Sequence, residues 1–411
     1  FPRIGELPYL LTLPAYGFYW FNLTAAAAEK AAPAQQTSPE LFTLVMTGGF
    51  ETILHGREKT AFETTMAPRF IATQRWFGGG GAVPKRTVVL DEAALPNRVG
   101  ANGFLLPLVR VELPNGEHQD YSIPLAIEER GEPDDLLPYA VARVRRGPRI
   151  GLLYSAGSSA DFALSAIEAI RSDSTIPTRA GGQISFKPAA TLADYTDVGP
   201  GEVKRLSAEQ SNTSIAVGEH MLLKLYRRLQ SGPHPEVEVA RFLTEVAGFA
   251  NTPPLLGTVE YTAPDGSPTA LAIVQRFLRN QGDAWSWLLN QLKRELDTIA
   301  LIPPQETIQV EDALASLLQT VRALGRRTAE LHLAFATPTD DPAFSLEPMT
   351  IDDVRVAADD ARRQGERAFA AVARLTRQAE GPARESMEAL LERREECWSL
   401  IGPCVEAPDG A

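Results

Sequence analysis

Residues 203–226 read Val203-Lys-Arg-Leu-Ser-Ala-Glu-Gln-Ser-Asn-Thr-Ser-Ile-Ala-Val-Gly-Glu-His-Met-Leu-Leu-Lys-Leu-Tyr226, and this stretch decides the expected fold. The pattern predicts three short strands joined by two tight turns. Lys224 lies inside the third, apolar strand, between Leu223 and Leu225. A charge at such a position is expensive to bury unless an anionic group meets it.

A helix is predicted directly afterwards, in Pro235-Glu-Val-Glu-Val-Ala-Arg-Phe-Leu243. In kinases a turn-bearing hairpin covers the nucleotide phosphates, a strand lysine holds them, and a helix glutamate orients the lysine. The alternative for Lys224 is a residue at a sheet edge whose amine reaches solvent. Glu236 and Glu238 lie on different sides of the helix. Glu238 is the preferred partner, because Val237 and Phe242 then flank an inward stripe.

Composition narrows the functional class. The 411 residues carry a net charge of −12, which disfavours nonspecific binding to nucleic acid or an anionic membrane. No apolar run is long enough to span a membrane, and the start does not read as a signal peptide. Cys397 and Cys404 are the two cysteines, so we expect no disulfide framework, no zinc site and a cytoplasmic location.

Changes in pattern along the chain predict five segments of an α+β fold. Aromatic-rich residues 1–23 suit the edge of a β-sandwich, and the Ala-, Gln- and Pro-rich residues after them suit a linker. Helices and antiparallel strands then predict a small cap, a second antiparallel lobe, and a charge-rich helical region. The expected segments are 1–23, a linker at 24–40, a cap at 41–135, a nucleotide-binding lobe at 136–282 and a partial helical lobe at 283–411.

Several of these segments carry a family resemblance. Ser-Ala-Glu-Gln-Ser-Asn-Thr-Ser at 207–214, Leu-Lys-Leu-Tyr-Arg-Arg-Leu at 223–229 and the helix at 236–243 resemble the ATP-binding lobe of maltokinases. These are aminoglycoside-phosphotransferase-like enzymes that phosphorylate maltose from ATP. Phe-Ile-Ala-Thr-Gln-Arg-Trp-Phe-Gly at 70–78 resembles the signature of their N-terminal cap. Residues 5–21 resemble the last strands of trehalose synthase, which many bacteria fuse ahead of maltokinase.

The resemblance implies a kinase-like fold and a set of nucleotide contacts. Lys224 would hold the α- and β-phosphates with Glu238 orienting it, and backbone groups around Gln275 and Phe277 would bind adenine. Residues 207–214 lack any glycine-rich phosphate motif, and from pattern alone they are an ordinary polar turn. The resemblance instead implies phosphate contacts from Ser211, Asn212, Thr213 and Ser214.

The catalytic half of such a kinase is missing from the pattern. The family's His-Gly-Asp-x-His loop and its later Asp-rich strand do not occur, so we expect neither a catalytic residue nor a Mg²⁺ ligand here. The resemblance places both, with the maltose site, beyond Ala411. We therefore expect a fragment of a trehalose synthase and maltokinase fusion that is inactive alone.

Two other interpretations stay open at this point. The chain could be a non-catalytic module that couples a trehalose synthase to its kinase, as the linker and cap would allow. It could also belong to a kinase for another sugar or an aminoglycoside, although residues 5–21 argue against this. Nucleotide binding separates the coupling module from both kinases.

Overall fold

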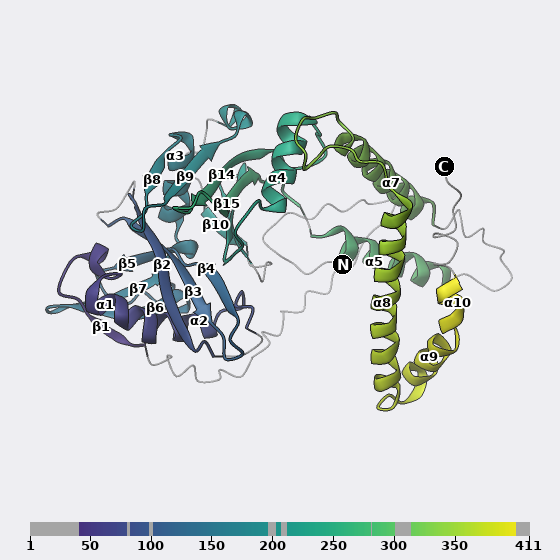
Figure 1. Cartoon of the computed structure of the whole chain (residues 1–411), viewed down its shortest axis with the longest axis horizontal. Helices are drawn as coiled ribbons and strands as arrows, with labels where there is room; N and C mark the ends of the chain where they lie inside the picture. Colours follow the sequence, from purple (N-terminus) through teal and green to yellow (C-terminus); the bar gives the residue numbers. More distant parts are fainter. Residues whose placement is uncertain are drawn as a thin grey trace, which may run out of the picture. The chain divides into compact units, whose positions relative to one another are not determined.

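The computed structural model describes residues 41–79, 83–97, 102–195, 203–206, 212–280, 282–300 and 314–399 (Figure 1). The predicted strands at 1–23, the linker at 24–40, Ser211 and Cys404 lie outside the described residues. Within them, antiparallel sheets and helices alternate in an α+β arrangement. The predicted α+β class is confirmed.

The first sheet forms the centre of the cap. Its central path runs β1-β6-β7-β5-β3-β4-β13, and β2 pairs with β3 off this path. Every pairing is antiparallel except the parallel one between β1 and β6. The strands are β1 (Thr43–Val45), β2 (Arg86–Leu95), β3 (Phe104–Glu112), β4 (His118–Ser122), β5 (Leu125–Glu128), β6 (Ala140–Arg146), β7 (Arg149–Ser155) and β13 (Arg228–Leu229).

A bulge in β2 divides the cap's packing between two cores. Val89 belongs to a core formed with the first helices, whereas Ala93 and Leu95 belong to a core shared with the second sheet. The pairing register shifts between Val89 and Asp91. Because side chains alternate along a strand, one extra residue moves all later ones to the other face. We call the shared core the inter-sheet core.

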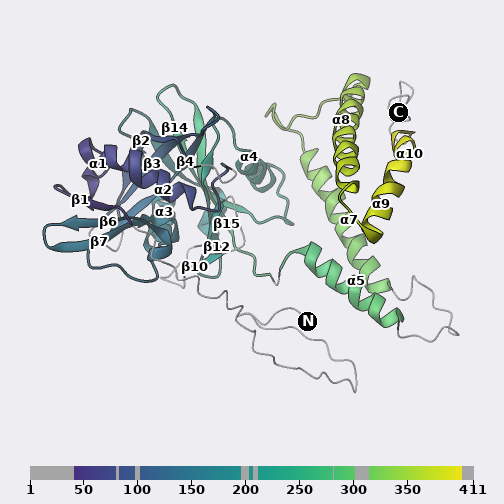
Figure 2. The same cartoon turned by 90° about the horizontal axis from the view of Figure 1, so that it is seen from below.

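The second sheet contains the Lys224 hairpin, and Figure 2 labels its strands β10, β12, β14 and β15. Its strand order is β10-β11-β12-β15-β14-β9-β8. All of its pairings are antiparallel. The three strands expected in 203–226 are present as β10, β11 and β12. The strands are β8 (Thr175–Pro177), β9 (Gln183–Pro188), β10 (Val203–Leu206), β11 (Asn212–Val217), β12 (Met221–Tyr226), β14 (Leu255–Thr262) and β15 (Pro268–Arg276).

Helices cover the two sheets. α1 (Gly56–Ala61) and α2 (Ala67–Ala72) cover the cap with a π-helical turn between them, and α3 (Ala160–Arg171) packs in the inter-sheet core. α4 (Pro235–Arg241) packs on the other face of the second sheet, through Val237 and Ala240. The short strand β1 precedes these first helices and begins the cap.

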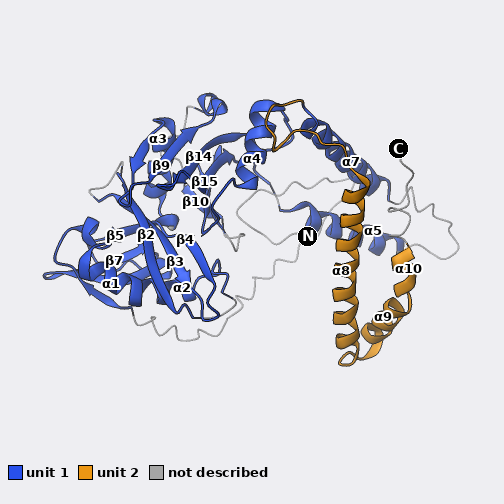
Figure 3. Ribbon diagram, viewed as in Figure 1, with its two compact units in different colours: residues 1–337 blue, residues 338–411 orange. Residues whose placement is uncertain are grey.

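The chain divides into two compact units, residues 1–337 and 338–411 (Figure 3). α5 (Ala284–Ala300) and α7 (Ala315–Phe335) belong to the first unit. The second contains α8 (Ile351–Thr376), α9 (Gly381–Glu392) and α10 (Arg394–Ser399). Within it, the rings of Phe369 and Trp398 meet edge-on with centroids 5.4 Å apart. No helix among the described residues is both long and apolar enough to cross a membrane.

The first sheet extends past residue 135, the expected end of the cap. Strands β6 and β7 fall in the range expected for the nucleotide-binding lobe. They pair instead with β1 and β5, so the first sheet continues to Ser155. Local sequence patterns identify strands but not the sheet that they join, and this pairing depends on contacts between distant parts of the chain.

Candidate functional site

Lys224 lies near the middle of β12 and faces α4. Neighbouring residues Leu223 and Leu225 point the other way, into the inter-sheet core, as strand alternation requires. Ser214 of β11 and Ile273 of β15 lie directly opposite Lys224 on the two flanking strands. Its side chain is 17% exposed, so the amine is largely removed from water.

The carboxylate of Glu236 meets this amine. Lys224 Nζ lies 3.1 Å from Glu236 Oε1, and the Tyr226 hydroxyl donates to Glu236 Oε2 at 3.0 Å. Lys224 and Tyr226 are two residues apart in one strand and therefore share a face. Both oxygens of one carboxylate are thus held from β12, which fixes the plane of the group as well as its position.

The preference for Glu238 as the partner of Lys224 is therefore corrected to Glu236. At about 100° per residue, Glu236 lies about 70° from the centre of the stripe formed by Val237 and Ala240, and Glu238 about 130°. The sequence argument also used Phe242 to define the inward face. Phe242 begins a π-helical turn, so it does not continue the α-helical spacing.

His234 precedes α4 and stacks on Tyr226, with ring centroids 4.0 Å apart at 26°. Its Nδ1 is buried and has no hydrogen-bond partner in the part of the chain that the structure describes. Burial lowers the pKa of His234 and outweighs the charges of Glu236 and Glu238, which raise it, while the charge of Lys224 lowers it further. The neutral ring is the form that suits this stacked position beside Lys224.

The predicted phosphate-contacting residues divide between the two faces of β11. Asn212 and Ser214 lie opposite Tyr226 and Lys224, on the face of the lysine. Thr213 is 2% exposed and points to the inter-sheet side. The expected phosphate contact from the Thr213 side chain is therefore corrected. Its hydroxyl instead accepts a hydrogen bond from Arg227 Nε at 2.9 Å.

The expected adenine-binding segment ends β15. Gln275 and Phe277 are both half-buried, and Gln275 pairs with Leu222 and Leu255. The N–H of Phe277 donates to the His220 carbonyl at 2.8 Å, and that of Arg276 to the Pro254 carbonyl at 3.1 Å. These two backbone donors are already used, so the adenine contacts expected from backbone groups around Gln275 and Phe277 would have to come from the other groups of this segment.

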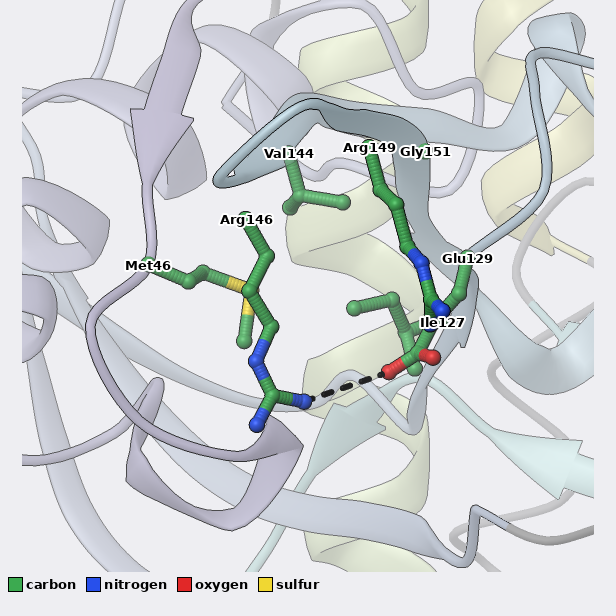
Figure 4. A pocket seen from close by; sticks show the side chains of 7 residues that line it. All are labelled: Met46, Ile127, Glu129, Val144, Arg146, Arg149 and Gly151. Atoms are coloured by element: carbon green, nitrogen blue, oxygen red, sulfur yellow. Dashed lines mark ion pairs between the residues drawn. The ribbon is translucent and has the colours of Figure 1, made fainter.

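The described residues form cavities that neither Lys224 nor Glu236 lines. A cavity of about 20 Å³ in the cap, near the Arg146–Glu129 ion pair of 3.9 Å, has room for about one water molecule (Figure 4). An open depression of about 420 Å³ lies behind the end of β15, where Arg276 and Leu278 meet residues of the 248–254 loop.

The described part of the chain holds no group of three His, Cys, Asp or Glu side chains that could bind a metal ion. What the described residues provide is a cation on a strand, a carboxylate that orients it, and two polar side chains, Asn212 and Ser214, on the same face.

Tyr226 is the contact that the sequence argument missed. Its signal was present, because period-two alternation places Tyr226 beside Lys224, and a buried tyrosine hydroxyl requires a partner. Arg227 gave no comparable signal, since it follows Tyr226 in a polar run where solvent exposure is the usual outcome.

Comparisons with known proteins identify relatives of parts of this chain. Residues 70–157 match the maltokinase N-terminal cap domain family. A glucosamine kinase of Mycolicibacterium smegmatis is 29% identical over 150 residues, which is 36% of this chain and 33% of the relative. The chain thus spans about a third of that protein's length. The cap match and this relative agree with the kinase-like α+β fold that the sequence predicted.

A short stretch resembles a different enzyme. The trehalose synthase/amylase TreS of Mycobacterium tuberculosis is 79% identical over 24 residues, 6% of this chain and 4% of the relative. A solved glucosamine kinase in complex with glucosamine, ADP and inorganic phosphate superimposes with a TM-score of 0.48 at 19% identity, covering 82% of this chain and 64% of that one. The chain is thus similar to the maltokinase N-terminal cap family over residues 70–157 and, over parts of its length, to a glucosamine kinase and to a trehalose synthase/amylase.

Proposed function

We propose that this chain forms the cap and the ATP-binding lobe of a sugar kinase of the maltokinase type. The single observation that carries the proposal is the Lys224–Glu236 pair, a strand lysine oriented by a helix carboxylate beside a three-stranded hairpin. In kinases this arrangement positions the lysine on the nucleotide phosphates. Asn212 and Ser214 would contribute further polar contacts, and ATP would bring Mg²⁺ whose ligands belong to another part of the protein.

The acceptor that we propose is maltose, which would be converted to maltose 1-phosphate. The cap match at residues 70–157 supports this choice, because that family is described as part of maltokinase. The short trehalose synthase match supports a fusion in which maltose and trehalose are interconverted beside the kinase. Such a fusion would join both activities in one cytoplasmic protein.

A second acceptor is favoured by one specific observation. The curated relative with 29% identity over 150 residues is a glucosamine kinase, so an amino sugar is the alternative substrate. The two acceptors can be compared in the full protein that carries this chain. A higher kcat/KM for maltose than for glucosamine supports the proposal, and the reverse order replaces maltose with glucosamine.

ATP binding by the chain itself tests the nucleotide part. We expect Lys224→Met to weaken ATP binding by tenfold or more, the equivalent of roughly 1.4 kcal/mol. Lys187→Met is the matched control, because Lys187 lies on β9 of the same sheet and also pairs with a carboxylate, Asp173, at 2.9 Å.

The control should leave ATP affinity unchanged. Equal ATP affinities for the wild type and Lys224→Met would overturn the assignment of Lys224. Absence of ATP binding by the folded wild-type chain would instead support a non-catalytic coupling module.

A further inference from the structure

Arg227 occupies the crossing between the two sheets. It is the single residue between β12, which ends at Tyr226 in the second sheet, and β13, which begins at Arg228 in the first. Its carbonyl accepts a hydrogen bond from the Ser122 N–H of the cap at 2.8 Å. The backbone therefore ties the lysine strand to the cap at this residue.

The side chain of Arg227 reaches both sheets from this point. It is 3% exposed, and its Nε donates to Thr213 Oγ1 of β11 at 2.9 Å. Its guanidinium carbon lies 5.8 Å from the ring centroid of Trp76, a cap residue, within the range of a cation–π contact. A Cβ added at Gly157 would lie 2.0 Å from Nη2, so a larger residue there would displace the guanidinium.

The charge of Arg227 is poorly compensated. Nη1 is buried with no hydrogen-bond partner, and no ion pair joins Arg227 to a carboxylate of the described residues. Burial first, and the charge of Arg205 second, lower the pKa of Arg227 to about 9. An apolar residue would be cheaper at such a position than a cation without a counterion.

We propose that Arg227 is a positioning residue that couples the cap to the phosphate-facing side of β11. Holding Thr213 from one face of the strand fixes the orientation of Asn212 and Ser214, which point to the opposite face beside Lys224. The cap residue Trp76 in turn holds the guanidinium. The link to phosphate recognition rests on the proposed function, whereas the mechanical coupling does not.

The test separates these two parts. Thr213→Val removes the acceptor, Thr213→Ser keeps it, and Arg227→Met removes the donor. Thr87→Val is the matched control, because Thr87 is also fully buried and makes one hydroxyl hydrogen bond, to the Glu63 carbonyl at 2.7 Å in the cap. Amide hydrogen exchange of residues 212–217 and the affinities for ATP and adenosine are measured for each variant.

We expect Thr213→Val and Arg227→Met to accelerate exchange in 212–217 and to weaken ATP binding by about three- to tenfold, while adenosine affinity changes by less than about twofold. Thr213→Ser should resemble the wild type, and Thr87→Val should change neither readout. Unchanged exchange in both Thr213→Val and Arg227→Met would overturn the coupling.

An equal loss of ATP and adenosine affinity would also overturn the proposal, since it would show a merely structural role. If the wild type bound no ATP, the proposed function would fail, and the exchange measurement would still decide the coupling.

Discussion

Asp91 and Arg227 are two buried charges where the cap meets the second sheet, and they are satisfied very differently. Asp91 is 4% exposed and accepts hydrogen bonds from Thr178 Oγ1 at 2.5 Å, Ala180 N at 2.8 Å, Tyr261 OH at 2.9 Å and Glu92 N at 2.8 Å. Arg227 has the Thr213 acceptor at 2.9 Å, a cation–π contact and an Nη1 with no hydrogen-bond partner among the described residues.

This difference in hydrogen bonding indicates different roles for Asp91 and Arg227 between the cap and the second sheet. A carboxylate that accepts four hydrogen bonds is fully satisfied and links parts of the structure. Removing it would leave three buried donors that belong to other elements without an acceptor. Burial, and then the hydrogen bond to Asp91, raise the pKa of Tyr261, so its hydroxyl stays a donor. A buried guanidinium with one hydrogen-bond acceptor adds little to the stability of the fold. The role of Arg227 is therefore expected in the Lys224 site.

The largest expected effect is at Asp91. Asp91→Asn should lower the free energy of unfolding by about 3 kcal/mol, because the amide group cannot accept from all the buried donors. Urea denaturation measures this change. Asp265→Asn is the control, since Asp265 also accepts two hydrogen bonds, from Ser267, but at an exposed turn. Equal stability losses in the two variants would remove the distinction between Asp91 and an ordinary surface carboxylate.

Arg227→Met should have a much smaller effect on stability. We expect the free energy of unfolding to change by less than about 1 kcal/mol, or to rise, because an apolar side chain avoids the cost of the uncompensated charge. The same urea denaturation measures it. A decrease in the free energy of unfolding as large as that of Asp91→Asn would show that Arg227 is a structural link of the same kind. The proposed difference between the two residues would then be wrong.

His234 is a half-buried group, unlike Asp91 and Arg227, and its charge changes with pH. Its pKa is lowered from 6.5 by burial, so on acidification the unfolded chain takes up the proton first. Stability should therefore fall as the pH drops below 6.5, and His234→Phe should lack that component while keeping the stack on Tyr226. Thermal unfolding across this pH range measures the difference, and identical pH profiles for the two proteins would contradict it.

The sequence predicted the hairpin and its lysine because both have strong local signals. A lone cation among leucines, two tight turns and a following helix were enough to place Lys224 on a central strand beside a helix carboxylate. Which carboxylate it meets depended on where α-helical spacing stops. No local sequence pattern indicates the π-helical turn that begins at Phe242. The sequence therefore favoured Glu238, whereas the structure pairs Lys224 with Glu236.

Features that depend on pairing between distant strands were not predictable. Tertiary contacts decide which sheet β6 and β7 join and where the chain crosses between the sheets at Arg227. They also decide that the Thr213 side chain points into the protein. A buried arginine without a carboxylate is also the opposite of what its residue type favours. Sequence patterns identified the elements of the site, but not the connection between the site and the cap.

A double-mutant cycle on ATP binding tests the central claim most directly. Lys224→Met and Glu236→Gln are measured singly and together, with Lys224→Met and Glu238→Gln as the control cycle. We predict that Glu236→Gln weakens ATP binding in the wild type but has almost no further effect in Lys224→Met, while the Glu238 cycle is additive. Additive effects of Lys224 and Glu236, or ATP affinity that neither substitution alters, would contradict the nucleotide site proposed for this protein.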